Sequence, residues 1–148
     1  MDALDFYGKI KEYCKENKIY LCLGENEFAN FLSDRKIYNA YDLIMCADLR
    51  LSPSYGDSGI ENVVYSGIIS LGRKKEEMTQ ATLDELFQQK YERRLKELTE
   101  LLLAVFDEFV CSEEMEMLRC DISYRINSYD ANIDFVSANV SIRVPYNE

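Results

Sequence analysis

The stretch from Leu118 to Val144 alternates apolar and polar residues on either side of a polar loop. Because successive side chains of a β-strand point to opposite faces, this period of two predicts an antiparallel hairpin. One face would be apolar and buried: Leu118, Cys120, Ile122, Tyr124, Ile126, Val136, Ala138, Val140, Ile142 and Val144. The other would suit water or a wet interface: Arg119, Asp121, Ser123, Arg125, Ser137, Asn139, Ser141 and Arg143. The rest of the chain has to supply a layer that covers the apolar face.

A second hairpin is predicted in the middle of the chain. Residues 41–51 alternate between a core face and a mixed face that holds Asp42, Ile44, Cys46, Asp48 and Arg50. The segment 52–62, SPSYGDSGIEN, is rich in residues that favour turns, and 63–72, VVYSGIISLG, is the expected returning strand. We therefore expect a long loop at the hairpin tip, of a kind that often carries contacts.

Two amphipathic helices are predicted. The first covers residues 2–16, where Leu4, Tyr7, Ile10 and Cys14 recur at helical spacing. The second begins at a capping box, Thr82 with Glu85, and runs from Leu83 to Val110 over ~42 Å. Its apolar stripe consists of Leu83, Phe87, Tyr91, Leu95, Leu98, Leu102, Val105 and Phe109. Between the helices we expect a short buried strand over 19–23 and a short helix or turn over 25–35.

Length and composition agree with a single domain over residues 1–148. The chain is 47% apolar and 30% charged, with two prolines and six glycines, a balance typical of folded proteins. The predicted elements combine into an α+β fold. In it, a mostly antiparallel sheet of two hairpins packs against one long helix and an N-terminal helix.

Signatures of a reactive site are missing from the sequence. Without histidine the chain cannot build a Ser-His-Asp or Cys-His site, and it has neither GxxxxGK[ST] nor GxGxxG. Carboxylates could hold magnesium, but Asp42 and Asp48 are separated along their strand, and Asp130 and Asp134 are interpreted as turn-forming residues. The spacing of the five cysteines favours buried thiols over metal or redox roles. They are Cys14, Cys22, Cys46, Cys111 and Cys120. We predict no catalytic, metal-binding or cofactor-binding residue and no enzymatic activity.

The charge of the chain narrows its possible partners. A formal net charge of −10 argues against sequence-specific nucleic-acid binding, because such affinity comes largely from Lys and Arg that neutralise phosphates. The sequence has no signal-peptide pattern and no apolar run of the ~20 residues that cross a bilayer. We therefore expect no membrane association and a cytoplasm-like compartment.

Candidate contact residues lie in the predicted turns. The eleven tyrosines are numerous for this length, and tyrosine is favoured where one protein is buried against another. The segment GRKKEE could contact phosphate, although a solvated turn before the long helix is the stronger interpretation. The predicted protein-interface residues are Tyr55, Asp57, Arg73, Lys74, Tyr129 and Asp130.

The order of these elements resembles the tail-terminator and tail-completion proteins of tailed bacteriophages and prophages. The resemblance covers nearly the whole chain in architecture, and QKYERRLKEL followed by NIDFVSANVSI carries most of it. It implies a protomer that forms a ring, commonly a hexamer, at the head–tail junction of the virion. Such a ring is assembled in the bacterial cytoplasm, ends tube polymerisation and joins the tail tube to the connector. The family has no catalytic site to carry over.

Two alternatives stay open on the sequence. A related phage neck or adaptor ring would share most of these features and differ in the surface that it caps. A cytoplasmic α+β enzyme or ligand-binding protein would instead need a concave site with converging polar groups.

Overall fold

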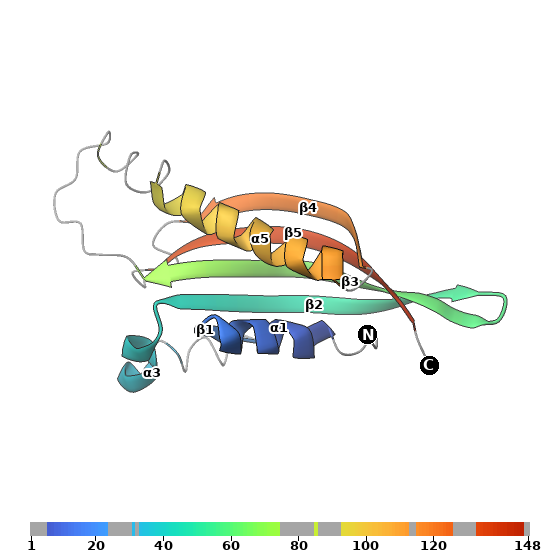
Figure 1. Cartoon of the computed structure of the whole chain (residues 1–148), viewed down its shortest axis with the longest axis horizontal. Coiled ribbons are helices and arrows are strands. Elements are labelled where there is room, and N and C mark those ends of the chain that lie inside the picture. The colour runs from blue at the N-terminus through green and yellow to red at the C-terminus, as the bar shows by residue number, and fades with distance from the viewer. Residues whose placement is uncertain are drawn as a thin grey trace.

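The computed structural model of the chain (Figure 1) describes residues 6–23, 31, 33–74, 85, 93–112, 115–125 and 133–146. The α+β class is confirmed, with two hairpins and helices that lie against the sheet. In chain order the elements are α1 (Phe6–Glu16), β1 (Ile19–Cys22), α3 (Arg35–Ala40), β2 (Leu43–Gly56), β3 (Gly59–Lys74), α5 (Lys96–Ser112), β4 (Glu116–Arg125) and β5 (Ile133–Pro145).

The strands form one five-stranded sheet in the order β1-β2-β3-β5-β4. The hairpins β2–β3 and β4–β5 are both antiparallel, as expected, and β3 joins them by pairing with β5. The strand predicted over 19–23 is present as β1, which pairs in parallel with the start of β2. Among the described strands, one edge of the sheet is formed by β1 and by the part of β2 that β1 does not pair with, and the other edge is β4.

Helices α1 and α5 bury the main core against one face of the sheet. Phe6, Ile10 and Cys14 of α1 are buried, which confirms the helical spacing predicted for this segment. The predicted stripe of the second helix is buried from Leu95 onward. Each fully buried Leu of that stripe contributes about 1.5–3 kcal/mol relative to an exposed one. The stripe residues in the core are Leu95, Leu98, Leu102, Val105 and Phe109.

A second, smaller core lies on the opposite face at one end of the sheet. Cys22, Ile44 and Phe135 contribute to it from the strands, and Phe31 also belongs to it. Helix α3 starts at its N-cap Asp34, whose carboxylate accepts hydrogen bonds from the amides of Lys36 and Ile37. This cover explains why the mixed face predicted for β2 is buried at Ile44 and becomes polar only farther along.

The prediction of a long loop over 52–62 is wrong. Strands β2 and β3 stay paired until Gly56 meets Gly59, so that Asp57 and Ser58 alone make the turn. Serine and proline fit here because this part of β2 lies at an edge, where a proline lacking its N–H does not interrupt the ladder. A register shift between Ser54 and Tyr55 marks a β-bulge near the tip.

Two residues of the predicted apolar face are exposed. Leu118 is 43% exposed because the register slips between Met117 and Arg119, so that Met117 packs on the core instead. Tyr124 is 50% exposed, since α5 lies against β3 and β5 and leaves this part of β4 uncovered. The core positions of β5 are confirmed as predicted: Val136, Ala138, Val140, Ile142 and Val144.

Some predictions fall on residues outside the described ranges. These are the first turn of the N-terminal helix with Leu4, the capping residue Thr82, most of the helical segment before Arg93, and Ile126. Glu85 is helical, and a π-helical turn at Arg93–Leu95 leads into α5.

Candidate functional site

The sheet has a long unpaired strand edge along β2. The parallel strand β1 covers only Leu43 to Cys46 of β2. From Ala47 to Gly56, none of the strands within the described ranges pairs with β2 on the side opposite β3. An exposed row of backbone donors and acceptors is the usual template for adding a strand from another chain. This segment, Ala47–Gly56, is called the β2 edge below.

One position of the β2 edge is capped from within the molecule. The hydroxyl of Tyr7, on α1, accepts a hydrogen bond from the Leu49 amide at 3.0 Å and donates one to the Leu49 carbonyl at 3.1 Å. Both groups of Leu49 therefore point away from β3. Because backbone directions alternate along a strand, those of Leu51 and Pro53 point the same way. Pro53 offers no donor, so Leu51 carries the outermost complete donor and acceptor pair before the bulge.

The distal part of the β2–β3 hairpin extends past both α1 and α5 (Figure 1). Pairing of β3 with β5 ends at Asn62 and Pro145, followed by one more bond from the Tyr146 amide to the Glu61 carbonyl. The tip beyond it is called the arm, and comprises residues 55–60. The predicted contact residues Tyr55 and Asp57 lie on it, and Tyr55 is 72% exposed. An exposed tyrosine on a projecting hairpin suits a protein contact.

The other predicted contact residues lie elsewhere. Arg73 and Lys74 end β3 at the side of the sheet away from the arm. Arg73 forms ion pairs with Asp42, at 3.6 Å, and with Glu97, at 3.5 Å. Lys74 donates to the Tyr38 carbonyl and lies over the Tyr38 ring, 4.6 Å from its centroid. These internal contacts make both cations poorer interface candidates than Tyr55, and Tyr129 and Asp130 lie outside the described residues.

Asp134 is a buried charge that the sequence interpretation missed. It was expected to form a turn, but it lies in β5 with 0% exposure, and its carboxylate is 3.4 Å from the Arg94 guanidinium. Arg94 also donates to the Lys74 carbonyl at 2.7 Å. A buried carboxylate needs such partners, so this cluster ties the segment before α5 to the strand ends. Its signal in the sequence is one acid inside the apolar run Ile133–Val136.

The polar face of the sheet is open beyond the second core. Serines pair across β3 and β5, with Oγ–Oγ distances of 2.7 Å for Ser70 and Ser137 and 3.4 Å for Ser66 and Ser141. Ile68 lies between these pairs and is 49% exposed. The face predicted for water or a wet interface is thus polar, with one apolar side chain between the serine pairs.

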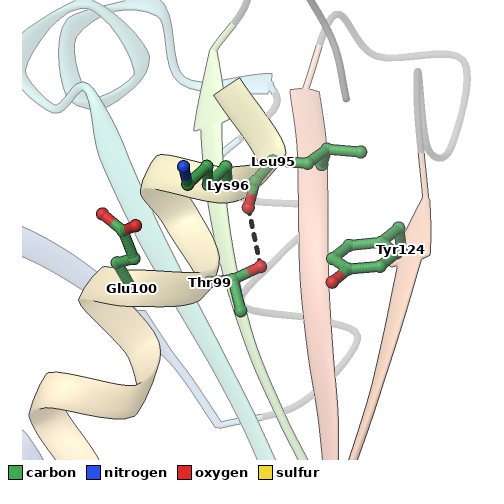
Figure 2. Close-up of a pocket in the computed structure, with 5 residues that line it drawn as sticks. All are labelled: Leu95, Lys96, Thr99, Glu100 and Tyr124. Carbon is green, nitrogen blue, oxygen red and sulfur yellow. Dashed lines mark hydrogen bonds between the residues drawn. The ribbon is translucent and has the colours of Figure 1, made fainter. Parts of the chain in front are cut away.

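Two of the open pockets lined by described residues lie beside the helices. Figure 2 shows the first, of about 440 Å³, where the start of α5 faces Tyr124 of β4 across the pocket. Its Thr99 hydroxyl donates to the Leu95 carbonyl at 2.7 Å, as a helical threonine often does. The second, of about 830 Å³, is lined by Tyr20, Ser33, Asp34, Arg35, Lys36 and Ile37. Neither brings together an acid–base pair that would support catalysis.

No group of three or more metal-ligating side chains occurs among the described residues. The thiols of Cys14, Cys22, Cys46 and Cys120 are reduced. None of the helices that the structure describes is long and apolar enough to cross a membrane.

Comparison with known proteins gave no match, whether to a protein-family model, to a curated protein or to a solved structure. The resemblance to phage proteins therefore stays a hypothesis that rests on the order of the elements.

Proposed function

We propose that this chain is a non-enzymatic assembly protein whose copies join edge to edge into a closed ring. The observation that carries the proposal is the β2 edge, which no described strand pairs with from Ala47 to Gly56 and which leads into an exposed arm. A soluble protein normally blunts or covers so long a strand edge. Here Ala47 is buried, Tyr7 caps Leu49, and Pro53 and the bulge lie farther out, so the backbone of Leu51 is the position left for a neighbouring copy.

The sheet also supplies a different edge for that neighbour. Strand β4 lies at the opposite side, so each copy carries two unlike edges. Pairing unlike surfaces head to tail generates a ring when the rotation between copies closes. The added strand would run antiparallel to β2 if the neighbour keeps its orientation, since β4 is antiparallel to β5 and β5 to β3. Arg50 and Asp121, exposed on the same sheet face, can then pair across the junction.

In the phage setting the ring belongs at the head–tail junction of the virion. It is assembled in the bacterial cytoplasm, ends the tail tube and joins it to the connector. The order of the elements supports this placement, as does the acidic composition, because a negatively charged channel repels passing DNA. A neck or adaptor ring is the nearest alternative, and complementation of terminator-deficient and adaptor-deficient phages separates the two.

Mass measured by light scattering over a concentration series, with negative-stain imaging, tests ring formation. Leu51→Lys on the β2 edge and Leu118→Lys on β4 should each abolish the ring, because each places a charge in the junction. Leu103→Lys on α5 is the matched control and should still form rings. The three leucines are 42%, 43% and 41% exposed, so the cost to folding is similar.

Mixing the two edge variants gives a sharper test. Each retains one intact edge, so an equimolar mixture should form a dimer and no ring. Rings in either single variant would overturn the edge-to-edge arrangement. Because a terminator can stay monomeric until it meets a tube, purified tail tubes should be added as a second assay. A wild-type protein that stays monomeric and binds no tube would overturn the proposal.

A further inference from the structure

Cys22 and Cys46 face each other on adjacent strands at the covered end of the sheet. They are direct partners in the parallel β1–β2 ladder, so their side chains leave the same face. Neighbouring strands are about 4.8 Å apart, which lies within the range of Cα separations seen in disulfides. Both side chains belong to the second core, where Cys22 is buried and Cys46 packs against it.

The two thiols differ in access and in ionisation. Cys22 has 0% exposure, whereas Cys46 is half-buried. The hydrogen bond from Cys22 lowers the pKa of Cys46 against the opposing effect of burial. A lowered pKa increases the thiolate fraction, which is the form that attacks a disulfide. Burial raises the pKa of Cys14 to about 12, and burial together with Asp121 raises that of Cys120. The thiols of Cys14 and Cys120 are therefore expected to react more slowly than that of Cys46.

We infer that Cys22 and Cys46 form a dithiol site that low-molecular-weight disulfides oxidise to a reversible disulfide between β1 and β2. The inference is independent of ring formation. It rests on the in-register placement of the pair and on the unequal access of the two thiols.

The reaction consists of two exchanges. The Cys46 thiolate attacks oxidised glutathione, which forms a mixed disulfide and releases one glutathione thiolate. The Cys22 thiolate then attacks the Cys46 sulfur, which closes the protein disulfide and releases the second glutathione. The two electrons pass to oxidised glutathione, and the two cysteine protons end on the released glutathiones. Strand β1 is four residues long and lies at the edge of the sheet, so it can adjust to the bond with little cost to the ladder.

The test incubates the reduced, full-length protein with oxidised glutathione and counts thiols in denaturant. Wild type should fall from five thiols to three. Peptide mapping should link the peptide of Cys22 to that of Cys46, and dithiothreitol should restore all thiols. Amide exchange in β1 should slow on oxidation, since the bond fixes that strand to β2.

Three variants make the assignment specific. Cys22→Ser should stop at a stable glutathione adduct on Cys46, and Cys46→Ser should not react at this site. Cys14→Ser, whose thiol lies on the opposite face beside Met45, should behave as wild type. A lasting glutathione adduct in wild type, a bond between other cysteines, or no loss of thiols would overturn the inference. Because the peptide map of wild type decides this alone, a poorly folding variant does not weaken the test.

Discussion

At the scale of single residues, Gly67 fixes how closely β2 and β3 approach. Its φ of 153° is a backbone conformation that residues with side chains rarely adopt. A Cβ atom added there would lie 2.1 Å from the Asp48 carbonyl oxygen, which belongs to the paired backbone of β2. The neighbouring strand cannot move aside without loss of the ladder, so glycine is required at this position.

Gly67→Ala should therefore lower the free energy of unfolding by about 2–4 kcal/mol, from backbone strain and the clash together. Urea denaturation followed by circular dichroism measures the change. Gly8→Ala on the exposed side of α1 is the matched control, because a Cβ there meets nothing within 4 Å. It should raise stability by up to about 1 kcal/mol. Equal effects of the two substitutions would contradict the tight approach at Gly67.

Cys14 makes the stability of the fold depend on pH in the alkaline range. Burial raises its pKa from 9.0 to about 12 in the folded state. The unfolded chain therefore loses this proton first as the pH rises above 9, and stability falls between pH 9 and about 12. Cys14→Ala should make the decline in melting temperature across this range shallower. The remaining decline would come from groups such as Tyr13, whose pKa burial also raises. An unchanged slope would show that Cys14 does not contribute.

At the scale of elements, periodicity predicted most of the fold. Both hairpins and helices α1 and α5 followed from their spacing, because a single buried face imposes a period of two or 3.6. The continuation of β2 and β3 through Ser52 to Asn62 was missed, since turn-forming residues also occur in an exposed edge hairpin, where packing does not select them. The bulge at Leu118 was missed because it leaves no mark on the alternation.

The candidate site was less predictable than the fold. Tyr55 and Asp57 were placed correctly at a hairpin tip, but Arg73 and Lys74 form contacts with residues far away in the sequence, namely Asp42, Glu97 and Tyr38. The Arg94–Asp134 pair likewise joins distant segments. The unpaired β2 edge follows from the shortness of β1, which only the three-dimensional pairing reveals.

Tyr7 couples helix α1 to the β2 edge. Tyr7→Phe removes both hydrogen bonds to Leu49 and should cost about 1–2 kcal/mol of stability. It should also expose one more backbone pair and strengthen association between copies, measured as a shift of the concentration midpoint in light scattering. Tyr13→Phe is the control on the same helix, because its ring contact with Phe109 is retained. Weaker association in Tyr7→Phe than in the control would contradict a capping role.

At the scale of the whole molecule, the two sheet faces and the two sheet edges all differ. One face carries α1 and α5, while the described residues cover the other face at the end that holds the second core. One edge is the β2 edge with its arm, and the other is β4. Two unlike edges allow head-to-tail contacts between copies, whereas two-fold pairing would join the same edge of both copies.

Net charge sets the salt dependence of that assembly. Each copy carries −10, so copies repel at low ionic strength, and the Debye length shortens from about 30 Å at 0.01 M to about 8 Å at 0.15 M salt. We expect the midpoint concentration for ring formation to fall as salt is raised over this range. Sedimentation velocity over a protein concentration series at each salt level measures this midpoint. Dissociation on adding salt would instead indicate a junction held mainly by ion pairs such as Arg50 with Asp121.

The joining of β3 to β5 also bears on the order in which the chain folds. Each hairpin closes between segments close in sequence, and such closures take about microseconds. The β3–β5 ladder instead brings Asn62 to Pro145 and Lys74 to Ile133, so a large loop must be ordered before its contacts are gained. We expect the two hairpins to form early and their docking to limit the folding rate. During that interval β3 and β5 are themselves unpaired edges, and during synthesis the first hairpin has to wait until the last strand is made.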